Sequence, residues 1–77
     1  MNQPAVISSI VRRVEAILYI AARPVTAGEL AEACEAEPAQ VAEALQELRR
    51  EFAEPAHGIV LHEVGGGFTF VVARDCE

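Results

Sequence analysis

Hydrophobic residues recur at helical spacing along this chain up to Phe52 and then change to the alternation that is typical of strands. Before the change, apolar positions spaced at i, i+3, i+4 and i+7 predict amphipathic helices. After it comes a loop at residues 53–58, which contains Pro and Gly. Residues 59–64 and 68–73 then read as two strands joined by Gly65-Gly66-Gly67, because glycine supplies the positive φ that a tight hairpin needs. The pattern therefore predicts a helical part followed by one β-hairpin.

The first predicted helix has the most regular apolar stripe, which consists of Ile7, Ile10, Val11, Val14, Ile17, Leu18 and Ala21. Ser8 or Ser9 is suited to cap a late start, whereas Asn2-Gln3-Pro4 is suited to open an earlier one. We expect the helix to end near Ala22 or Arg23, because Pro24 biases the residue before it away from helical conformation.

Two shorter helices follow, with a turn at residues 35–37 between them. Thr26-Ala27-Gly28-Glu29 has the sequence of a capping box, in which Thr26 caps the helix and Glu29 reaches back to the Thr26 amide. The buried face of this helix is predicted to be Leu30, Ala31, Ala33 and Cys34. Pro38 takes the first position of the next helix, whose apolar stripe is Val41, Ala44, Leu45, Leu48 and Phe52.

Three helices followed by a β-hairpin wing form a winged helix-turn-helix, an α+β fold that is mainly α. We expect residues 1–6 to be an N-terminal tail or an early first turn of helix one. Residues 7–77 are expected to form a single winged-helix domain.

The third helix lies where a winged helix reads DNA, yet its outward face is acidic. The face consists of Glu43, Glu47 and Glu54, with Gln40 and Gln46 beside them. DNA affinity comes mainly from Lys and Arg that neutralise phosphates, and the wing between Gly58 and Ala73 contains no basic residue. Arg49 and Arg50 close the helix, where they complement its dipole. With 12 acidic and 6 basic residues in the chain, the charge favours a protein partner over nucleic acid or an anionic membrane.

The chain also has more apolar surface than one core requires. In helix one, Val6, Ile17 and Ile20 broaden the stripe, interrupted by Arg13. In the hairpin, we expect Ile59, Leu61, Phe68, Phe70 and Val72 to face inward, with a bulge near Val64. Val60 and Val71 are then left on the opposite face of the hairpin. Apolar residues in excess on both helix one and the hairpin favour an interface over scattered surface residues. The predicted interface residues are Val6, Arg13, Ile17, Ile20, Val60 and Val71.

Candidate chemical groups are few. Cys34 and Cys76 are the only cysteines, and without a secretory signal they indicate free thiols in a reducing cytoplasm. A thiol–imidazole pair of Cys34 with His57 or His62 is disfavoured, because Cys34 is expected to be buried in its helix and both histidines to lie at the surface. A zinc site formed by Cys34, His57, His62 and Cys76 lacks the paired short spacing that such sites show. Gly65-Gly66-Gly67 has no helix behind it to bind phosphate. We therefore expect no catalytic residue, cofactor or metal, and no apolar run reaches the ~20 residues of a membrane span.

Four segments in order are similar to the N-terminal domain of the segregation and condensation protein B family, ScpB. They are EAILYIAARPV at residues 15–25, ELAEA at 29–33, ALQELRREF at 44–52 and GIVLHEVGGGF at 58–68. The resemblance implies a non-enzymatic subunit of the bacterial condensin, cytoplasmic and associated with the nucleoid through its complex. It implies partners as well: the kleisin ScpA and the Smc ATPase through the full-length protein, and a second copy through this domain. It also implies a second winged-helix domain, so we expect this chain to be a fragment.

A DNA-binding transcriptional regulator with a winged helix is the alternative, and the charge of helix three and of the wing separates it from a protein-binding module. An enzyme fragment would require a reactive group that the sequence does not offer.

Overall fold

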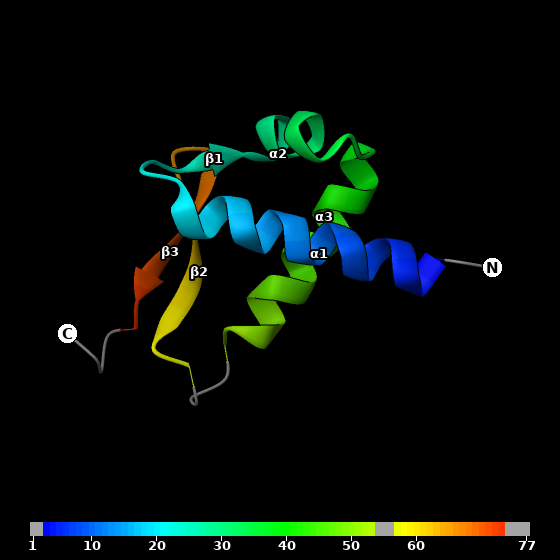
Figure 1. Ribbon diagram of the computed structural model, residues 1–77. Helices are drawn as coiled ribbons and strands as arrows, with labels where there is room; N and C mark the ends of the chain where they lie inside the picture. Colours follow the sequence, from blue (N-terminus) through cyan, green and yellow to red (C-terminus); the bar gives the residue numbers. More distant parts are fainter. Residues whose placement is uncertain (1–2, 54–56, 74–77) are drawn as a thin grey trace.

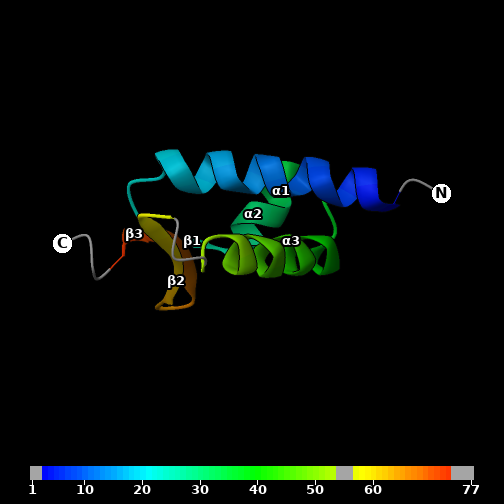
Figure 2. The ribbon, with the colours of Figure 1, turned by 90° about the horizontal axis from the view of Figure 1, so that it is seen from below.

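The computed structural model describes residues 3–53 and 57–73, and the side chains of this part from Ser8 onward. In chain order the elements are α1 (Gln3–Ile20), β1 (Val25–Thr26), α2 (Ala27–Cys34), α3 (Pro38–Glu51), β2 (Ile59–Val64) and β3 (Gly67–Val72) (Figure 1). The predicted winged helix-turn-helix is confirmed. Seen from below, α1 and α3 lie in two layers and the sheet sits at one end of them (Figure 2).

The core lies where the three helices and the hairpin meet. Its buried members are Ile10, Val14, Leu18, Leu30, Cys34, Val41, Ala44, Leu45, Leu48, Phe52 and Leu61. The whole predicted stripe of α3 is buried, and α1 packs along it. Of the face predicted for α2, Ala31 is half-buried and Ala33 is exposed, which corrects that prediction for Ala33.

The start of α1 is the earlier of the two expected starts, at Asn2-Gln3-Pro4, whereas its end differs from the expected one. The helix begins at Gln3 and ends at Ile20, before the predicted Ala22 or Arg23. The Ala21 N–H still donates to the Ile17 carbonyl at 3.0 Å, and the residues that follow lead into β1. Among the residues that the structure describes, no helix is both long enough and apolar enough to cross a membrane.

The capping box of α2 is present as predicted. The Thr26 hydroxyl accepts from the Glu29 N–H at 3.1 Å, and the Thr26 N–H donates to Glu29 Oε1 at 2.9 Å. At the other end, Glu35 takes the left-handed conformation with a φ of 53°. The Ala36 N–H then reaches the Ala31 carbonyl at 2.9 Å, which satisfies a carbonyl of the last turn.

The hairpin is regular, and the bulge expected near Val64 is absent. Pairing runs without interruption from Ile59 opposite Val72 to Val64 opposite Gly67. Gly65 and Gly66 have φ values of 59° and 81°, so they form a two-residue turn whose twist matches the strands. Gly67 therefore belongs to β3, not to the turn.

A third strand was not expected from the sequence. β1 pairs antiparallel with β3, Val25 opposite Phe68 and Thr26 opposite Gly67, so that β3 lies in the middle of the sheet. This pairing joins the start of α2 to the wing.

Candidate interaction surfaces

The outward face of α3 carries the carboxylates that the sequence predicted, apart from Glu54, which lies outside the described residues. The side chains of Glu43, Gln46 and Glu47 are exposed, and Gln40 is half-buried. Gln40 Oε1 accepts from the Glu37 N–H at 3.0 Å, which caps the helix start. Arg50 donates to Glu47 Oε1 at 2.7 Å. The charge of Glu47 is therefore partly balanced, whereas Glu43 forms no ion pair within the described residues.

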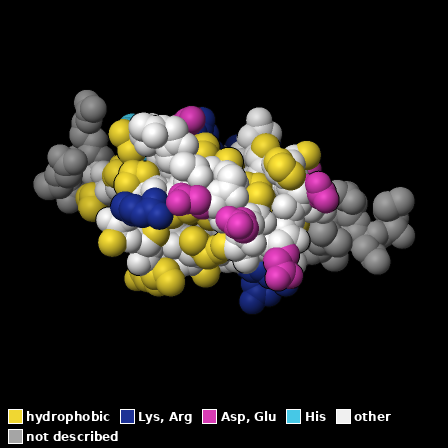
Figure 3. All heavy atoms as spheres, turned by 90° about the horizontal axis from the view of Figure 1, so that it is seen from above, with side chains coloured by type: hydrophobic (Ala, Val, Ile, Leu, Met, Phe, Trp, Pro, Cys, Tyr) yellow, Lys and Arg dark blue, Asp and Glu magenta, His cyan; other side chains and the backbone are white. Residues whose placement is uncertain are grey.

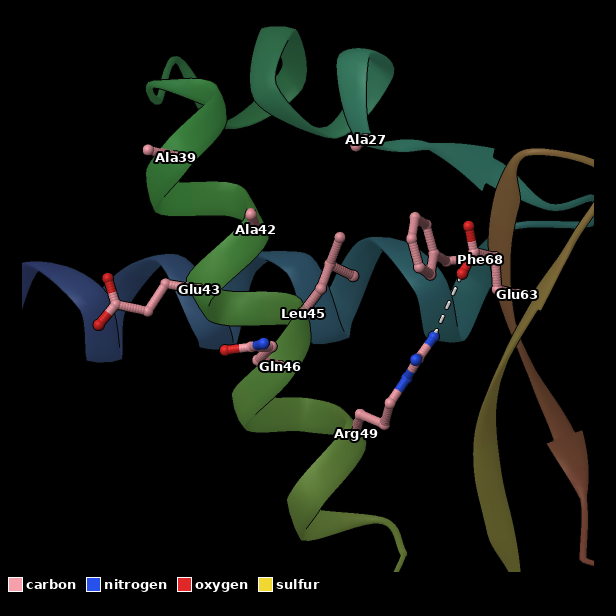
Figure 4. A pocket seen from close by; sticks show the side chains of 9 residues that line it. All are labelled: Ala27, Ala39, Ala42, Glu43, Leu45, Gln46, Arg49, Glu63 and Phe68. Atoms are coloured by element: carbon pink, nitrogen blue, oxygen red, sulfur yellow. Dashed lines mark ion pairs between the residues drawn. The ribbon is translucent and has the colours of Figure 1, made fainter.

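A groove of about 480 Å³ lies beside this face, between α3, the start of α2 and the wing. Its lining residues are Ala27, Ala39, Ala42, Glu43, Leu45, Gln46, Arg49, Glu63 and Phe68. Figure 4 shows Leu45, Arg49 and Phe68 pointing into the space between α3 and the hairpin, while Glu43 points to the other side of α3. The groove thus has an apolar wall formed by Leu45 and Phe68. Its floor on α3 is formed by the small residues Ala39 and Ala42, and Glu43 forms its acidic far rim.

One ion pair bridges the groove. Arg49 Nη2 lies 3.5 Å from Glu63 Oε1, and the two side chains are about equally exposed (Figure 4). Glu63 shares a face of the hairpin with Phe68, because these residues are paired across the strands. Besides complementing the dipole of α3, Arg49 is therefore engaged by the wing, a contact that the sequence did not predict.

A second surface lies at the end of the molecule where α1 ends and the sheet begins. Tyr19 and Ile20 are 76% and 80% exposed. In both ribbon views the end of α1 and the end of β3 lie at the same end of the molecule (Figures 1 and 2). Figure 3 shows hydrophobic side chains gathered over this end and acidic side chains over α2.

The last residues of β3 extend this apolar end. Val71 is 36% exposed on the outer face of the hairpin, where it pairs with the half-buried Val60. Val72 was expected to face inward. By register it does lie on the inner face, but it is 52% exposed because β3 ends there, beyond the buried cluster.

The other predicted interface residues have different surroundings. Ile17 is half-buried against the core. Arg13 donates to the Cys34 carbonyl at 3.2 Å and so caps the end of α2. The side chain of Val6 lies outside the described part. Tyr19 and Val72 are exposed but were not among the predicted interface residues, although the apolar run at the end of α1 contains Tyr19.

The thiol and imidazole groups do not assemble into a reactive site. Cys34 is buried, and burial raises the pKa of its thiol while the Arg13 charge opposes this in part. The His57 ring packs against the Phe52 ring at a tilt of 52°, with centroids 4.8 Å apart, and His62 is exposed on the hairpin. No cluster of three potential metal ligands occurs in the part of the chain that the structure describes. Cys76 lies outside that part.

Comparison with known proteins gives consistent matches. A segregation and condensation protein B from Syntrophotalea carbinolica is 42% identical over 55 residues, which cover 71% of this chain and 28% of that protein. The crystal structure of ScpB from Mycobacterium tuberculosis matches with a TM-score of 0.82 and 30% identity, covering 90% of this chain and 43% of that one.

A third match is a crystal structure described as a dimer of the ScpB N-terminal domain complexed with ScpA peptide. Its TM-score is 0.85 at 22% identity, over 91% of this chain and 88% of that one. The family model for the segregation and condensation complex subunit ScpB matches residues 12–77. The chain therefore belongs to the ScpB family, and it spans about a quarter of the length of the Syntrophotalea relative.

Proposed function

We propose that this chain is a non-enzymatic interaction module of the bacterial condensin, in which it forms a homodimer and takes part in binding the kleisin ScpA. Through that complex, which contains the Smc ATPase, it would act in chromosome condensation and segregation, in the cytoplasm and at the nucleoid. Family membership supports this role. A structural relative at 22% identity is a dimer bound to an ScpA peptide, which is consistent with it.

The observation that carries the proposal is the exposed apolar end of the molecule. Tyr19 and Ile20 on α1 lie at the same end as Val71 and Val72 on β3. Large side chains at this exposure gain free energy when a partner removes them from water, by roughly 25 cal/mol per Å² of apolar area. We place the homodimer contact on these residues together with Val60. Ile17 and Arg13 have intramolecular contacts that account for them.

The alternative of a DNA-binding regulator has less support. The family match does not favour it. In the structure, Arg49 and Arg50 are both engaged by carboxylates, and no strand of the wing contains Lys or Arg. A helix whose exposed face presents Glu43 and Glu47 would be repelled by phosphates.

The dimer is tested by sedimentation equilibrium of the full chain and of Ile20→Glu and Val71→Glu. We expect the unmodified chain to have about twice its monomer mass of 8.3 kDa. Each variant should weaken association tenfold or more, because a carboxylate without a partner would be buried in the contact.

Ala33→Glu is the matched control, since Ala33 is exposed on α2, away from this end. Urea unfolding should show all three variants within about 0.5 kcal/mol of the unmodified chain, as is usual for surface substitutions. A monomer mass for the unmodified chain at high micromolar concentration would overturn the proposal.

A further inference from the structure

We infer that the groove between α3 and the wing docks a segment of a partner polypeptide that presents an apolar side chain and, next to it, a Lys or Arg. The inference rests on the proposed function, because the partner it addresses is the kleisin. It goes beyond that function by assigning the surface and the chemistry of recognition.

The wall of the groove supplies the place for the apolar side chain. Leu45 and Phe68 point toward the same space from α3 and from β3 (Figure 4), and Ala27 lines it from the start of α2. Phe68 is only half-buried within the chain, so a partner side chain could cover more of its ring. A volume of about 480 Å³ is in the range in which proteins bind ligands, ~300–1,000 Å³.

The surface of α3 between this wall and the acidic rim is made of small side chains. Ala39 and Ala42 are exposed at i and i+3, so they lie on one face of the helix. Without longer side chains there, a partner backbone can cross α3 at close range. The Gln46 amide beside them can donate and accept hydrogen bonds with that backbone.

The charged residues that line the groove favour a segment with a basic side chain. The lining contains the carboxylates of Glu43 and Glu63 and the guanidinium of Arg49, which is engaged by Glu63. Of the two carboxylates in the lining, Glu43 on the far rim is the one that forms no ion pair within the described residues. A basic side chain that follows the apolar one across α3 would reach it. The net charge of -6 also favours approach of a basic segment.

The groove and the apolar end are separate surfaces. In Figure 4 α1 passes behind α3, so the groove opens on the side of α3 that faces away from α1. A segment docked in it would leave Tyr19 and Ile20 free for a second copy. One dimer would therefore offer two equivalent grooves.

The test measures the affinity of the purified ScpA of the same organism for the full chain by isothermal titration calorimetry. Ala42→Phe blocks the floor of the groove and Glu43→Lys reverses the charge of its rim. Each should raise Kd at least tenfold. The matched controls on the exposed surface of α2, Ala33→Phe and Glu32→Lys, should leave Kd within twofold. All four should keep the dimer mass and the unfolding midpoint of the unmodified chain.

Salt dependence gives an independent measurement. If Glu43 meets a basic group, Glu43→Gln should weaken binding at low ionic strength and reduce the dependence of Kd on salt. Equal salt dependence for this variant and the unmodified chain would contradict the ionic part of the inference.

The outcomes separate the two proposals. Unchanged ScpA affinity in Ala42→Phe and Glu43→Lys would overturn the groove and leave the proposed function standing. Equal losses in the α2 controls would also overturn it. If the unmodified chain bound no ScpA, the kleisin part of the proposed function would fail, and the groove with it, whatever the sedimentation result.

Discussion

At the scale of single residues, Gly67 shows how tightly the wing is joined to the rest of the fold. A Cβ atom at this position would lie 2.9 Å from Pro24 Cβ and 3.1 Å from the Pro24 carbonyl carbon. Its φ is not positive, so the absence of a side chain matters here for space and not for backbone freedom. The close approach is what lets β1 pair with β3.

We predict that Gly67→Ala destabilises the chain by about 1–3 kcal/mol, as overpacking does, because backbone atoms of Pro24 and Val25 would have to move. Gly28→Ala is the matched control. Its Cβ would lie 3.9 Å from the nearest atom, Thr26 Oγ1, and alanine should stabilise α2 by up to about 1 kcal/mol. Urea unfolding should show a lower free energy of unfolding for Gly67→Ala and a higher one for Gly28→Ala. A stability gain in Gly67→Ala would show that the contact with Pro24 and Val25 is relaxed.

Residue-level features were predictable where they depend on neighbours in sequence. The capping pair Thr26 and Glu29 follows from a local pattern and is present. The left-handed conformation of Glu35 does not follow from a local pattern, because this conformation favours Gly or Asn and costs other residues roughly 1 kcal/mol or more. The role of Gly67 depends on Pro24, which lies far away along the chain, so the glycine run was assigned to the turn as a whole.

At the scale of elements, the start of α2 joins a cap to an ion pair. Glu29 accepts from the Thr26 N–H, and Arg23 Nη2 lies 3.1 Å from its Oε2. The Arg23 hydrogen bond, followed by that from Thr26, lowers the pKa of Glu29 to about 2 from its ordinary value of 4.5. A carboxyl whose pKa is lower in the folded than in the unfolded state stabilises the fold above the unfolded value.

We therefore predict that the stability advantage of the unmodified chain over Glu29→Gln is complete above pH 4.5 and declines as pH falls toward 2. Both side chains are exposed, so the effect is small and depends on salt. The measurement is the urea midpoint as a function of pH. Glu32→Gln, on the same helix, is the control, because it removes a carboxylate that takes no part in the capping box. An advantage over Glu29→Gln that is the same at every pH would refute the coupling.

The helices and the hairpin were predictable because their periodicity is local, and the whole apolar stripe predicted for α3 is buried as expected. β1 was not predictable, since a two-residue strand has no pattern of its own and exists only because β3 lies beside it. The hairpin register was predicted with a bulge that the Gly65-Gly66 turn makes unnecessary.

At the scale of the whole molecule, the two surfaces differ in how far the sequence predicts them. Surplus apolar residues such as Ile20 and Val71 were visible in the pattern, and both are exposed. The groove was not visible, because it brings Leu45 on α3 and Phe68 on β3 together through the tertiary fold. The acidic face of α3 was predictable from the sequence. The ion pair between Arg49 and Glu63, which joins α3 to the wing, was not.

We propose that the face a winged helix offers to DNA meets a polypeptide instead in this chain. The most direct test is the anisotropy of a fluorescently labelled DNA duplex titrated with the full chain at low ionic strength, where phosphate contacts are strongest. We predict no saturable binding up to about 100 micromolar, the weak end of the range in which proteins bind DNA non-specifically. Tight binding that weakens steeply with added salt would contradict the account.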